Sequence, residues 1–187
     1  MRKIIISIIC ITFLLTSSNA QEKLNINITK SSIKWIGEYT FYFGGHNGFI
    51  NFIKGHFIKT GELITGGEFL IDMNSITNTD IKKIKARKSL VEHLKQADFF
   101  DTKKHPLAKL VITGVYYNSD ASMNIHALLT IKNITKPIKF NAIPNYKEKS
   151  LAAKFKIDRR EWDVNYKSKI RNSAISDAIG FEVKLKL

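Results

Sequence analysis

Cysteine is almost absent from the chain. Cys10 is the only cysteine among 187 residues, and it lies in an apolar segment at the N-terminus. A single thiol forms no disulfide within one chain, and removal of that segment would leave no cysteine for redox or nucleophilic chemistry. The stability of the protein must therefore come from an ordinary hydrophobic core, and 187 residues are enough to build one in a single domain.

A long hydrophobic run is also absent. The longest apolar stretch, residues 4–15, has about 12 residues, whereas a membrane-spanning helix needs about 20. The stretch follows Arg2 and Lys3, and the small residues at 18–20 come after it. This pattern predicts a secretory signal peptide over residues 1–20, cleaved after Ala20, ahead of one domain over residues 21–187. We therefore expect a periplasmic protein, and the alternative is an uncleaved N-terminal anchor.

Acidic side chains are scarce relative to basic ones. The chain has 30 Lys and Arg against 16 Asp and Glu, a net charge of +14. The predicted cleavage removes Arg2 and Lys3 and leaves +12. Such an excess favours anionic surfaces, and five of the positive charges lie within residues 82–88. For an exported protein we expect contact with a membrane surface and none with nucleic acid; a solvated basic face is the alternative.

The usual signatures of enzymes and metal sites are missing. There is neither a G-x-S-x-G nucleophile motif nor a glycine loop that would hold phosphate. His46, His93 and His105 are 47 and 12 residues apart, unlike the close histidine pairs of zinc sites. We therefore expect no metal, no cofactor and no catalytic residue. A hydrolase-type enzyme that uses histidine and aspartate is the less favoured alternative.

What the sequence does contain is alternation of apolar and polar residues, which is typical of strands with one buried face. Eight strands are predicted, over residues 33–43, 49–59, 67–73, 109–117, 123–131, 137–142, 151–157 and 181–187. Strands of this length would leave long exposed edges in a sandwich, and closure removes the edges. The sequence therefore predicts an all-β fold, an eight-stranded antiparallel barrel with an apolar interior.

Residues 89–106 form the one stretch that does not alternate. Ser89 and Glu92 have the S-x-x-E spacing of a capping box, which predicts a short helix that begins at Leu90, between the third and fourth strands. Phe99 and Phe100 follow this helix. We expect the stretch to pack against one end of the barrel, with the two phenylalanines as a seal.

Four motifs follow one another along the chain: GEFLIDMNSI, HLKQADFFDTKKHP, LTIKNITKPIKF and FKIDRREWDV, with IKWIG and HNGFINFIKGHF before them. In this order they resemble the motifs of the YceI family, which includes periplasmic polyisoprenoid-binding proteins. The resemblance extends from about residue 31 to the end of the chain. It implies a lipocalin-like barrel of eight strands that holds a long apolar chain in its interior.

Two positions depart from the family pattern. Asn133 stands where a glycine is usual, and asparagine can also adopt a positive φ in a turn. Asp163 stands where the family has glycine after the tryptophan or phenylalanine. We therefore expect the turn at Asn133 to be preserved and the turn at Asp163 to be the more altered of the two.

The resemblance also implies that the inward-facing apolar residues bind a ligand. Without it, these residues would be interpreted as ordinary core. The expected ligand is a long-chain amphiphile, such as a polyisoprenoid, an isoprenoid quinone or a fatty-acid derivative. The sequence leaves the choice between a monomer and a homodimer open. The expected lining residues are Trp35, Tyr39, Phe41, Phe69, Ile71, Val111, Val115, Ile125, Leu129, Phe155 and Val183.

A set of polar residues is expected at the mouth of the barrel or in its support: His46, Asp72, His93, Asp98 and Arg159. Arg159 follows a strand with a buried face and matches an arginine of the family. We expect it to be partly buried and paired with a carboxylate, because a buried charge needs a partner. His46, in a glycine-flanked turn, is the candidate for contact with a headgroup.

Overall fold

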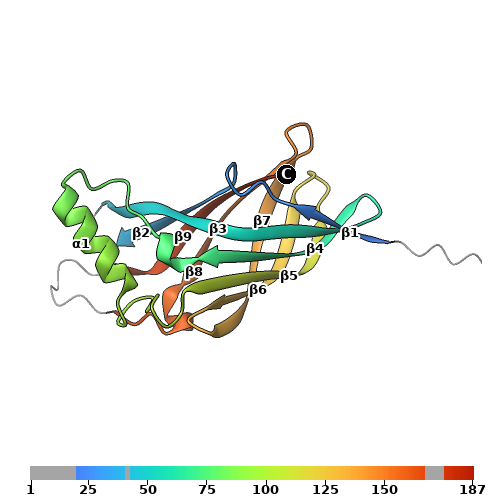
Figure 1. The fold of residues 1–187 in the computed structure, drawn as a ribbon. Helices are drawn as coiled ribbons and strands as arrows, with labels where there is room; N and C mark the ends of the chain where they lie inside the picture. Colours follow the sequence, from blue (N-terminus) through green and yellow to red (C-terminus); the bar gives the residue numbers. More distant parts are fainter. Residues whose placement is uncertain (1–19, 41–42, 167–174) are drawn as a thin grey trace, which may run out of the picture.

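The chain folds into a closed antiparallel barrel with one helix at its end (Figure 1). The computed structural model describes residues 20–40, 43–166 and 175–187. The strands are β1 (Gln21–Asn25), β2 (Ser32–Tyr39), β3 (Gly45–Thr60), β4 (Leu63–Asp72), β5 (Leu107–Tyr117), β6 (Met123–Ile131), β7 (Ile134–Asn145), β8 (Ser150–Asp158) and β9 (Ile175–Lys186). The helices are α1 (Ile84–Lys95) and two 3₁₀ turns, η1 (Met73–Ser75) and η2 (Arg159–Trp162).

Eight strands close the barrel. They are hydrogen-bonded in the order β3-β2-β9-β8-β7-β6-β5-β4, and β4 pairs again with β3. The 16-residue strand β3 is shared along its length: residues 45–50 pair with β2, and residues 56–60 pair with β1. The predicted eight-stranded antiparallel barrel is confirmed, with β1 as an additional strand that the sequence pattern did not reveal.

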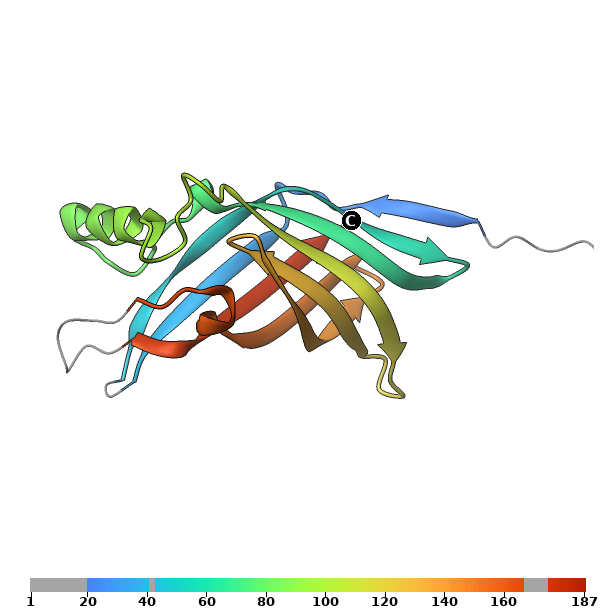
Figure 2. The same cartoon turned by 90° about the horizontal axis from the view of Figure 1, so that it is seen from below.

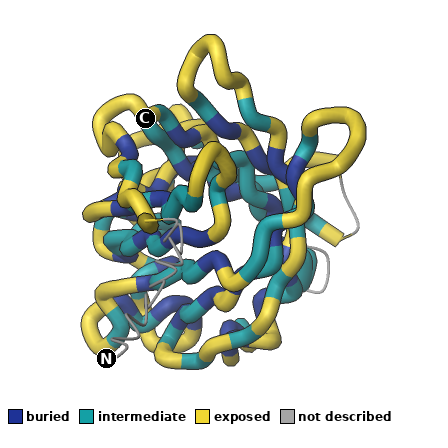
Figure 3. Tube along the Cα trace, turned by 90° about the vertical axis from the view of Figure 1, so that its right-hand side faces the viewer, coloured by how far each residue is buried: buried dark blue, intermediate teal, exposed yellow. Residues whose placement is uncertain are grey.

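Alternation along the strands places one set of side chains inside the barrel. In β6, Met123, Ile125 and Ala127 are each 1–2% exposed, and the residues between them are more exposed. A view along the barrel shows the strands as a ring with this alternation of buried and exposed positions (Figure 3). Gly55 of β3 is needed at one inner position, because a Cβ there would lie 2.4 Å from the Phe69 ring.

The interior contains two hydrophobic clusters. The far cluster, away from α1, includes Phe57, Phe69, Met123, Ile125 and Leu185. The near cluster, at the α1 end, includes Trp35, Met73, Leu94, Phe99 and Phe100. Partly buried side chains between them pack against both clusters: Ile71, Leu110, Ile138, Phe155 and Phe181.

The helix begins earlier than the capping motif predicts. α1 starts at Ile84, Lys83 is its N-cap without a side-chain hydrogen bond, and Ser89 lies exposed in the middle. The predicted start at Leu90 is therefore wrong. Lys85, Ala86 and Arg87 before Ser89 are good helix formers, so the helix begins within the basic residues 82–88. Figure 2 shows α1 projecting at one end of the barrel.

Turns also differ from their predicted positions. β2 ends at Tyr39, β3 already begins at Gly45, and Phe43 between them is fully exposed. Asn133 and Asp163 both adopt a positive φ, of 61° and 55°. The turn at Asn133 is thus preserved as expected, and Asp163 takes the left-handed conformation that ends η2.

Candidate ligand-binding cavity

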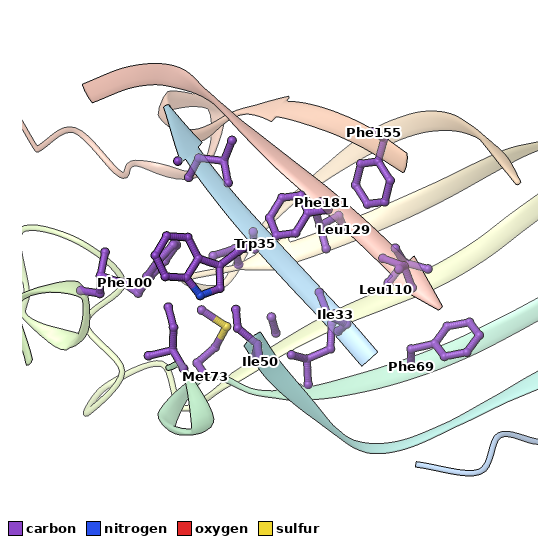
Figure 4. Close-up of a pocket in the computed structure, with 18 of the residues that line it drawn as sticks. Ile33, Trp35, Ile50, Phe69, Met73, Phe100, Leu110, Leu129, Phe155 and Phe181 are labelled. Atoms are coloured by element: carbon purple, nitrogen blue, oxygen red, sulfur yellow. The ribbon is translucent and has the colours of Figure 1, made fainter. Parts of the chain in front are cut away.

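The barrel encloses an apolar cavity between the two clusters. Its volume is about 390 Å³, within the range of cavities that hold small ligands. Figure 4 shows side chains from strands all around the barrel pointing toward this space, with Trp35 and Phe100 at one side and Phe69 at the other. Among the described lining residues, Glu38 is the only one with an Asp, Glu, Lys or Arg side chain.

Several inward side chains are only half-buried although they lie in the interior. Leu110, Phe155 and Phe181 line the cavity and retain partial exposure. Phe155 stacks on Phe140 at a centroid distance of 4.6 Å and on Phe181 at 5.4 Å. A plain core would bury such residues fully, as the far cluster does. The middle of the barrel is therefore hollow and lined by aromatic and aliphatic groups.

Most of the predicted lining residues border this cavity. They are Trp35, Tyr39, Phe69, Ile71, Ile125, Leu129, Phe155 and Val183. Val115 packs against the far cluster without bordering the cavity. Phe41 lies outside the described residues, as does Tyr42.

The sequence pattern predicts that Val111 lines the cavity, and this prediction is wrong. The cavity is lined by Ala108, Leu110 and Ile112 of β5, and Val111 is not among the lining residues. The pairing of β5 with β6 shifts between Ile112 and Gly114. A bulge reverses which residues point inward, so the alternation that is correct for Val115 is wrong before the bulge.

Residues that the sequence pattern missed come from β5, β7, β9 and the helical segment. The most prominent are Leu110, Phe140, Phe181, Leu90, Leu94, Phe99 and Phe100. Phe99 and Phe100 are only 4% and 9% exposed, and the expected packing against one end of the barrel is confirmed. Phe140 and Phe181 lie on strands whose alternation was recognised, and their side chains could have been included from that signal.

One side of the mouth carries a chain of hydrogen bonds from Tyr39 to Asp80. The Tyr39 hydroxyl lies 2.9 Å from Nε2 of His46, and Nδ1 of His46 lies 2.7 Å from Oδ2 of Asp80. Tyr39 and His46 both line the cavity. A shallow hollow outside the barrel shares Gly37, Glu38, Tyr39 and His46 with the cavity, so these residues lie where the interior meets the surface.

Asp80 is held by the segment that follows η1. Its Oδ1 accepts hydrogen bonds from the backbone N–H of Asn47 at 2.7 Å and from Nδ2 of Asn78 at 2.6 Å. Partial burial raises the pKa of the Asp80 carboxyl, but the hydrogen bonds from Asn47, His46 and Asn78 outweigh it and lower the pKa below its usual value. Asp80 is therefore an ionised acceptor at neutral pH.

The docking of this segment depends on Gly48. The backbone N–H of Thr77 donates to the Phe49 carbonyl, and Nε1 of Trp35 donates to the Thr77 carbonyl at 2.9 Å. A Cβ on Gly48 would lie 1.9 Å from the Thr77 oxygen. Only glycine allows the segment to approach β3 this closely, and the approach places Asp80 next to His46.

The α1 end of the barrel has a second histidine–carboxylate pair. Nε2 of His93 is 3.2 Å from Oδ2 of Asp98, and the imidazole meets Tyr166 edge-on with a centroid distance of 4.5 Å. His93 and Tyr166 line the cavity, whereas the Asp98 side chain is 53% exposed. The distance between the two atoms is longer than in the pair of His46 and Asp80, and the side chains are more exposed.

Arg159 supports the barrel next to the mouth. It is 5% exposed, and its guanidinium donates to Asp177 at 2.9 Å and to the carbonyls of Val164 and Ser176. The expected burial and carboxylate partner are confirmed. Asp72 does not border the cavity; its side chain accepts from Asn74 N–H at the start of η1.

Metal ligands are not gathered anywhere in the described part of the chain, where no three His, Cys, Asp or Glu side chains form a possible metal cluster. His105 lies apart from the cavity, and its buried Nδ1 has no hydrogen-bond partner among the described residues. In the same residues, no helix is both long and apolar enough to cross a membrane.

Comparison with known proteins matches the YceI-like domain to residues 21–187. A UPF0312 protein of Pseudomonas putida is 41% identical over 54 residues, a match that spans 29% of this chain and 28% of that relative. The structure of BcnA from Burkholderia cenocepacia superposes with a TM-score of 0.71 at 16% identity, covering 86% of this chain and 98% of BcnA. The YCEI protein of Campylobacter jejuni gives a TM-score of 0.51 at 19% identity, with coverages of 81% and 84%. At these identities the structural likeness concerns the fold.

Proposed function

The chain belongs to the YceI-like family, and from this premise we propose that it is an exported protein that binds a long-chain amphiphile inside its barrel. The family and the barrel support a role as a binding protein. The observation that carries the proposal is the set of half-buried aromatic side chains around the cavity, Phe140, Phe155 and Phe181. The signal-peptide pattern supports a periplasmic location.

The lining favours a ligand with a long apolar tail. Transfer of apolar surface from water to such a cavity gains about 25 cal/mol per Å². The polar lining groups, Glu38, Tyr39, His46, His93 and Tyr166, lie toward the end near α1, so a tail would occupy the interior and a headgroup the mouth. A polyisoprenoid, an isoprenoid quinone or a fatty-acid derivative fits this division. The protein would carry its ligand without changing it.

The test begins with the ligand that the protein carries from the cell. The mature protein is purified, extracted with organic solvent, and the extract is analysed by mass spectrometry. We expect an amphiphile with an isoprenoid or fatty chain. A protein that is repeatedly empty and takes up no such compound when it is offered would contradict the proposal.

Two matched variants connect uptake to the cavity. Leu110→Trp places an indole in the cavity, whereas Val111→Trp adds the same group at the neighbouring position, which does not line it. We expect Leu110→Trp to lose uptake and Val111→Trp to retain it, with both variants folded by circular dichroism. Equal uptake by the two variants would place the ligand elsewhere.

A second candidate function is docking to an anionic membrane. The basic cluster, defined as Lys82, Lys83, Lys85, Arg87 and Lys88, lies at the start of α1. Within the part of the chain that the structure describes, these five side chains form no salt bridge. Each cation next to an anionic bilayer contributes roughly 1 kcal/mol of attraction.

The position of the basic cluster favours docking at the mouth. Leu90 and Leu94, from the same helix, line the cavity. Ile84 lies among these cations at the start of α1, and its apolar side chain is 61% exposed. Cations beside exposed apolar groups are typical of segments that lie at membrane interfaces. A membrane bound here would face the opening of the cavity.

Vesicle sedimentation tests the docking. We expect the protein to sediment with anionic vesicles, to remain in solution with neutral ones, and to be released by salt. Changing Lys82, Lys83 and Lys85 to glutamate should abolish binding. The same changes at Lys23, Lys139 and Lys147, exposed lysines on strands β1 and β7 and in the β7–β8 turn, alter the net charge equally. Equal loss in both triple variants would show attraction by net charge alone and contradict docking through α1.

A further inference from the structure

The hydrogen bond of the Tyr39 hydroxyl at the mouth is fixed by two neighbours, His46 and Asp80. Asp80 is ionised and can only accept hydrogen bonds, so Nδ1 of His46, 2.7 Å away, must carry a proton. In the neutral imidazole, Nε2 then has no proton and accepts the hydroxyl of Tyr39. The Tyr39 oxygen is left with lone pairs and no free hydrogen.

We propose that Tyr39 recognises the polar end of the bound amphiphile, and that His46 and Asp80 present its oxygen as an acceptor for an uncharged headgroup that donates a hydrogen bond. This inference rests on the proposed function and names the chemistry of the ligand's polar end. An alcohol or a primary amide has the required donor. An ether, an ester or a quinone carbonyl can only accept, and finds no donor at Tyr39.

An anionic headgroup does not match the Tyr39 oxygen, because a phosphate or carboxylate without a proton can only accept hydrogen bonds. Glu38 precedes Tyr39 on β2 and borders the cavity, and its half-exposed carboxylate pairs with Lys156 at 3.1 Å. Asp80 is held on the other side of His46. A phosphate or carboxylate placed at Tyr39 would also lie near the ionised carboxylate of Asp80, and like charges repel. An uncharged headgroup avoids this repulsion.

The three residues come from separate parts of the chain, and the fold fixes their geometry. Tyr39 ends β2, His46 lies on β3, and Asp80 is reached through the segment docked on Gly48. Asp80 has hydrogen bonds to Asn47 and Asn78 besides the one to His46, and Asn78 is 5% exposed. A hydrogen-bonding group held on a rigid scaffold loses little entropy when a ligand binds.

The second histidine–carboxylate pair, His93 and Asp98, provides a built-in comparison. Its two atoms are 3.2 Å apart, against 2.7 Å for His46 and Asp80, and His93 contacts Tyr166 through the edge of the ring, without a hydrogen bond between them among the described contacts. The hydroxyl of Tyr166 is therefore not committed to an imidazole in the way that the hydroxyl of Tyr39 is. Tyr116, 57% exposed and also beside an imidazole, that of His126, does not line the cavity, so Tyr116→Phe is the control for Tyr39→Phe.

The experiment uses three ligands with the same tail: geranylgeraniol, its methyl ether and its phosphate. Dissociation constants are measured at about pH 8, where the ordinary imidazole is neutral. The wild-type protein should bind the alcohol roughly 3- to 10-fold more tightly than the ether, the range that one net hydrogen bond gives. The phosphate should bind more weakly than the alcohol.

The hydrogen-bonded chain of Tyr39, His46 and Asp80 is called the relay, and three variants test whether the preference for the alcohol depends on it. Tyr39→Phe retains the ring and removes the oxygen, so it should weaken binding of the alcohol to the level of the ether and leave the ether unchanged. Asp80→Asn should reduce the same preference, since it frees the histidine tautomer. Tyr116→Phe should retain the preference. A similar alcohol-to-ether ratio in wild type and Tyr39→Phe would overturn the inference.

The binding results distinguish failure of this inference from failure of the proposed function. If all three ligands bind equally well to the wild-type protein, the cavity binds the tail and Tyr39 does not select the headgroup. If the phosphate binds most tightly, the mouth selects an anion and the inference is also overturned. If none of the three binds, the proposed function fails together with it.

Discussion

At the end of the barrel away from α1, Phe57, Met123 and Ile125 are 1–2% exposed, whereas at the α1 end Tyr39, His46 and His93 remain half-buried around an opening. The far end is filled by apolar side chains that pack on one another. The mouth is lined by polar pairs and covered by a helix with a basic start. Complete packing stabilises the fold, and the end left incompletely packed is available to a ligand.

Truncation at the far end should have the largest effect on stability. Phe57 is 2% exposed and meets Phe69 edge-on with a centroid distance of 5.2 Å. Phe57→Ala should lower the free energy of unfolding by about 3–5 kcal/mol, because it leaves a cavity that the neighbours fill only partly. Denaturant titration measures the change.

The matched truncation at the other end is Phe43→Ala. Phe43 is fully exposed, so we expect a change within about 0.5 kcal/mol. Losses of similar size in the two variants would contradict the difference in packing between the two ends.

Loss of Arg159 should be the next largest effect, and it tests how the mouth is supported. Arg159→Ala removes donors from the carbonyls of Val164 and Ser176 and leaves Asp177 with Arg160 alone. Unsatisfied buried acceptors cost about 1–3 kcal/mol, and we expect a loss in this range. Arg160→Ala, at an exposed neighbouring position, should change stability little. Equal melting temperatures for Arg159→Ala and wild type would show that the buried guanidinium is not needed.

Asp80 should make the stability of the mouth depend on pH. Its carboxyl has a lowered pKa, so folding favours the ionised form, and this contribution is present above the ordinary value of about 4 and lost as pH falls through the folded value. Asp80→Asn should therefore be less stable than wild type at neutral pH, with a difference that narrows in acid. Unfolding at a series of pH values measures the difference.

The far end offers a counterpart in Asp120, in the turn between β5 and β6. Hydrogen bonds from the Ser122 hydroxyl and backbone N–H lower its pKa as well. Asp120 is exposed, so solvent screening should make the pH-dependent difference of Asp120→Asn smaller than that of Asp80→Asn. A difference for Asp80→Asn that does not vary with pH would contradict the ionised relay.

The smallest effect is expected at Ser89. Because Ser89 lies exposed in the middle of α1, Ser89→Ala should leave stability unchanged or raise it by a few tenths of a kcal/mol. A helix cap at this position would instead cost about 1 kcal/mol when removed. Thermal unfolding of the two proteins distinguishes the outcomes, and a clear loss would mean that α1 begins at Leu90.

Much of the fold could be predicted because alternation in a strand is a local property. The inward positions of β6 follow the sequence pattern along the whole strand, and the alternating stretches along the chain predicted the eight strands of the barrel. Alternation fails at Val111, because a bulge in the pairing with β6 depends on the neighbouring strand and leaves no local signal. The start of α1 was missed for a related reason, since a capping motif inside a helix reads the same as one at its beginning.

The sequence by itself determined the apolar interior and the absence of disulfides, because both follow from residue type and period. Only the tertiary structure decided how the mouth is assembled. His46 was a candidate, but its partner Asp80 lies 34 residues away and reaches it through a contact that only Gly48 permits. Hydrogen bonds between distant segments depend on how the backbone folds back on itself, and spacing along a chain does not encode that approach.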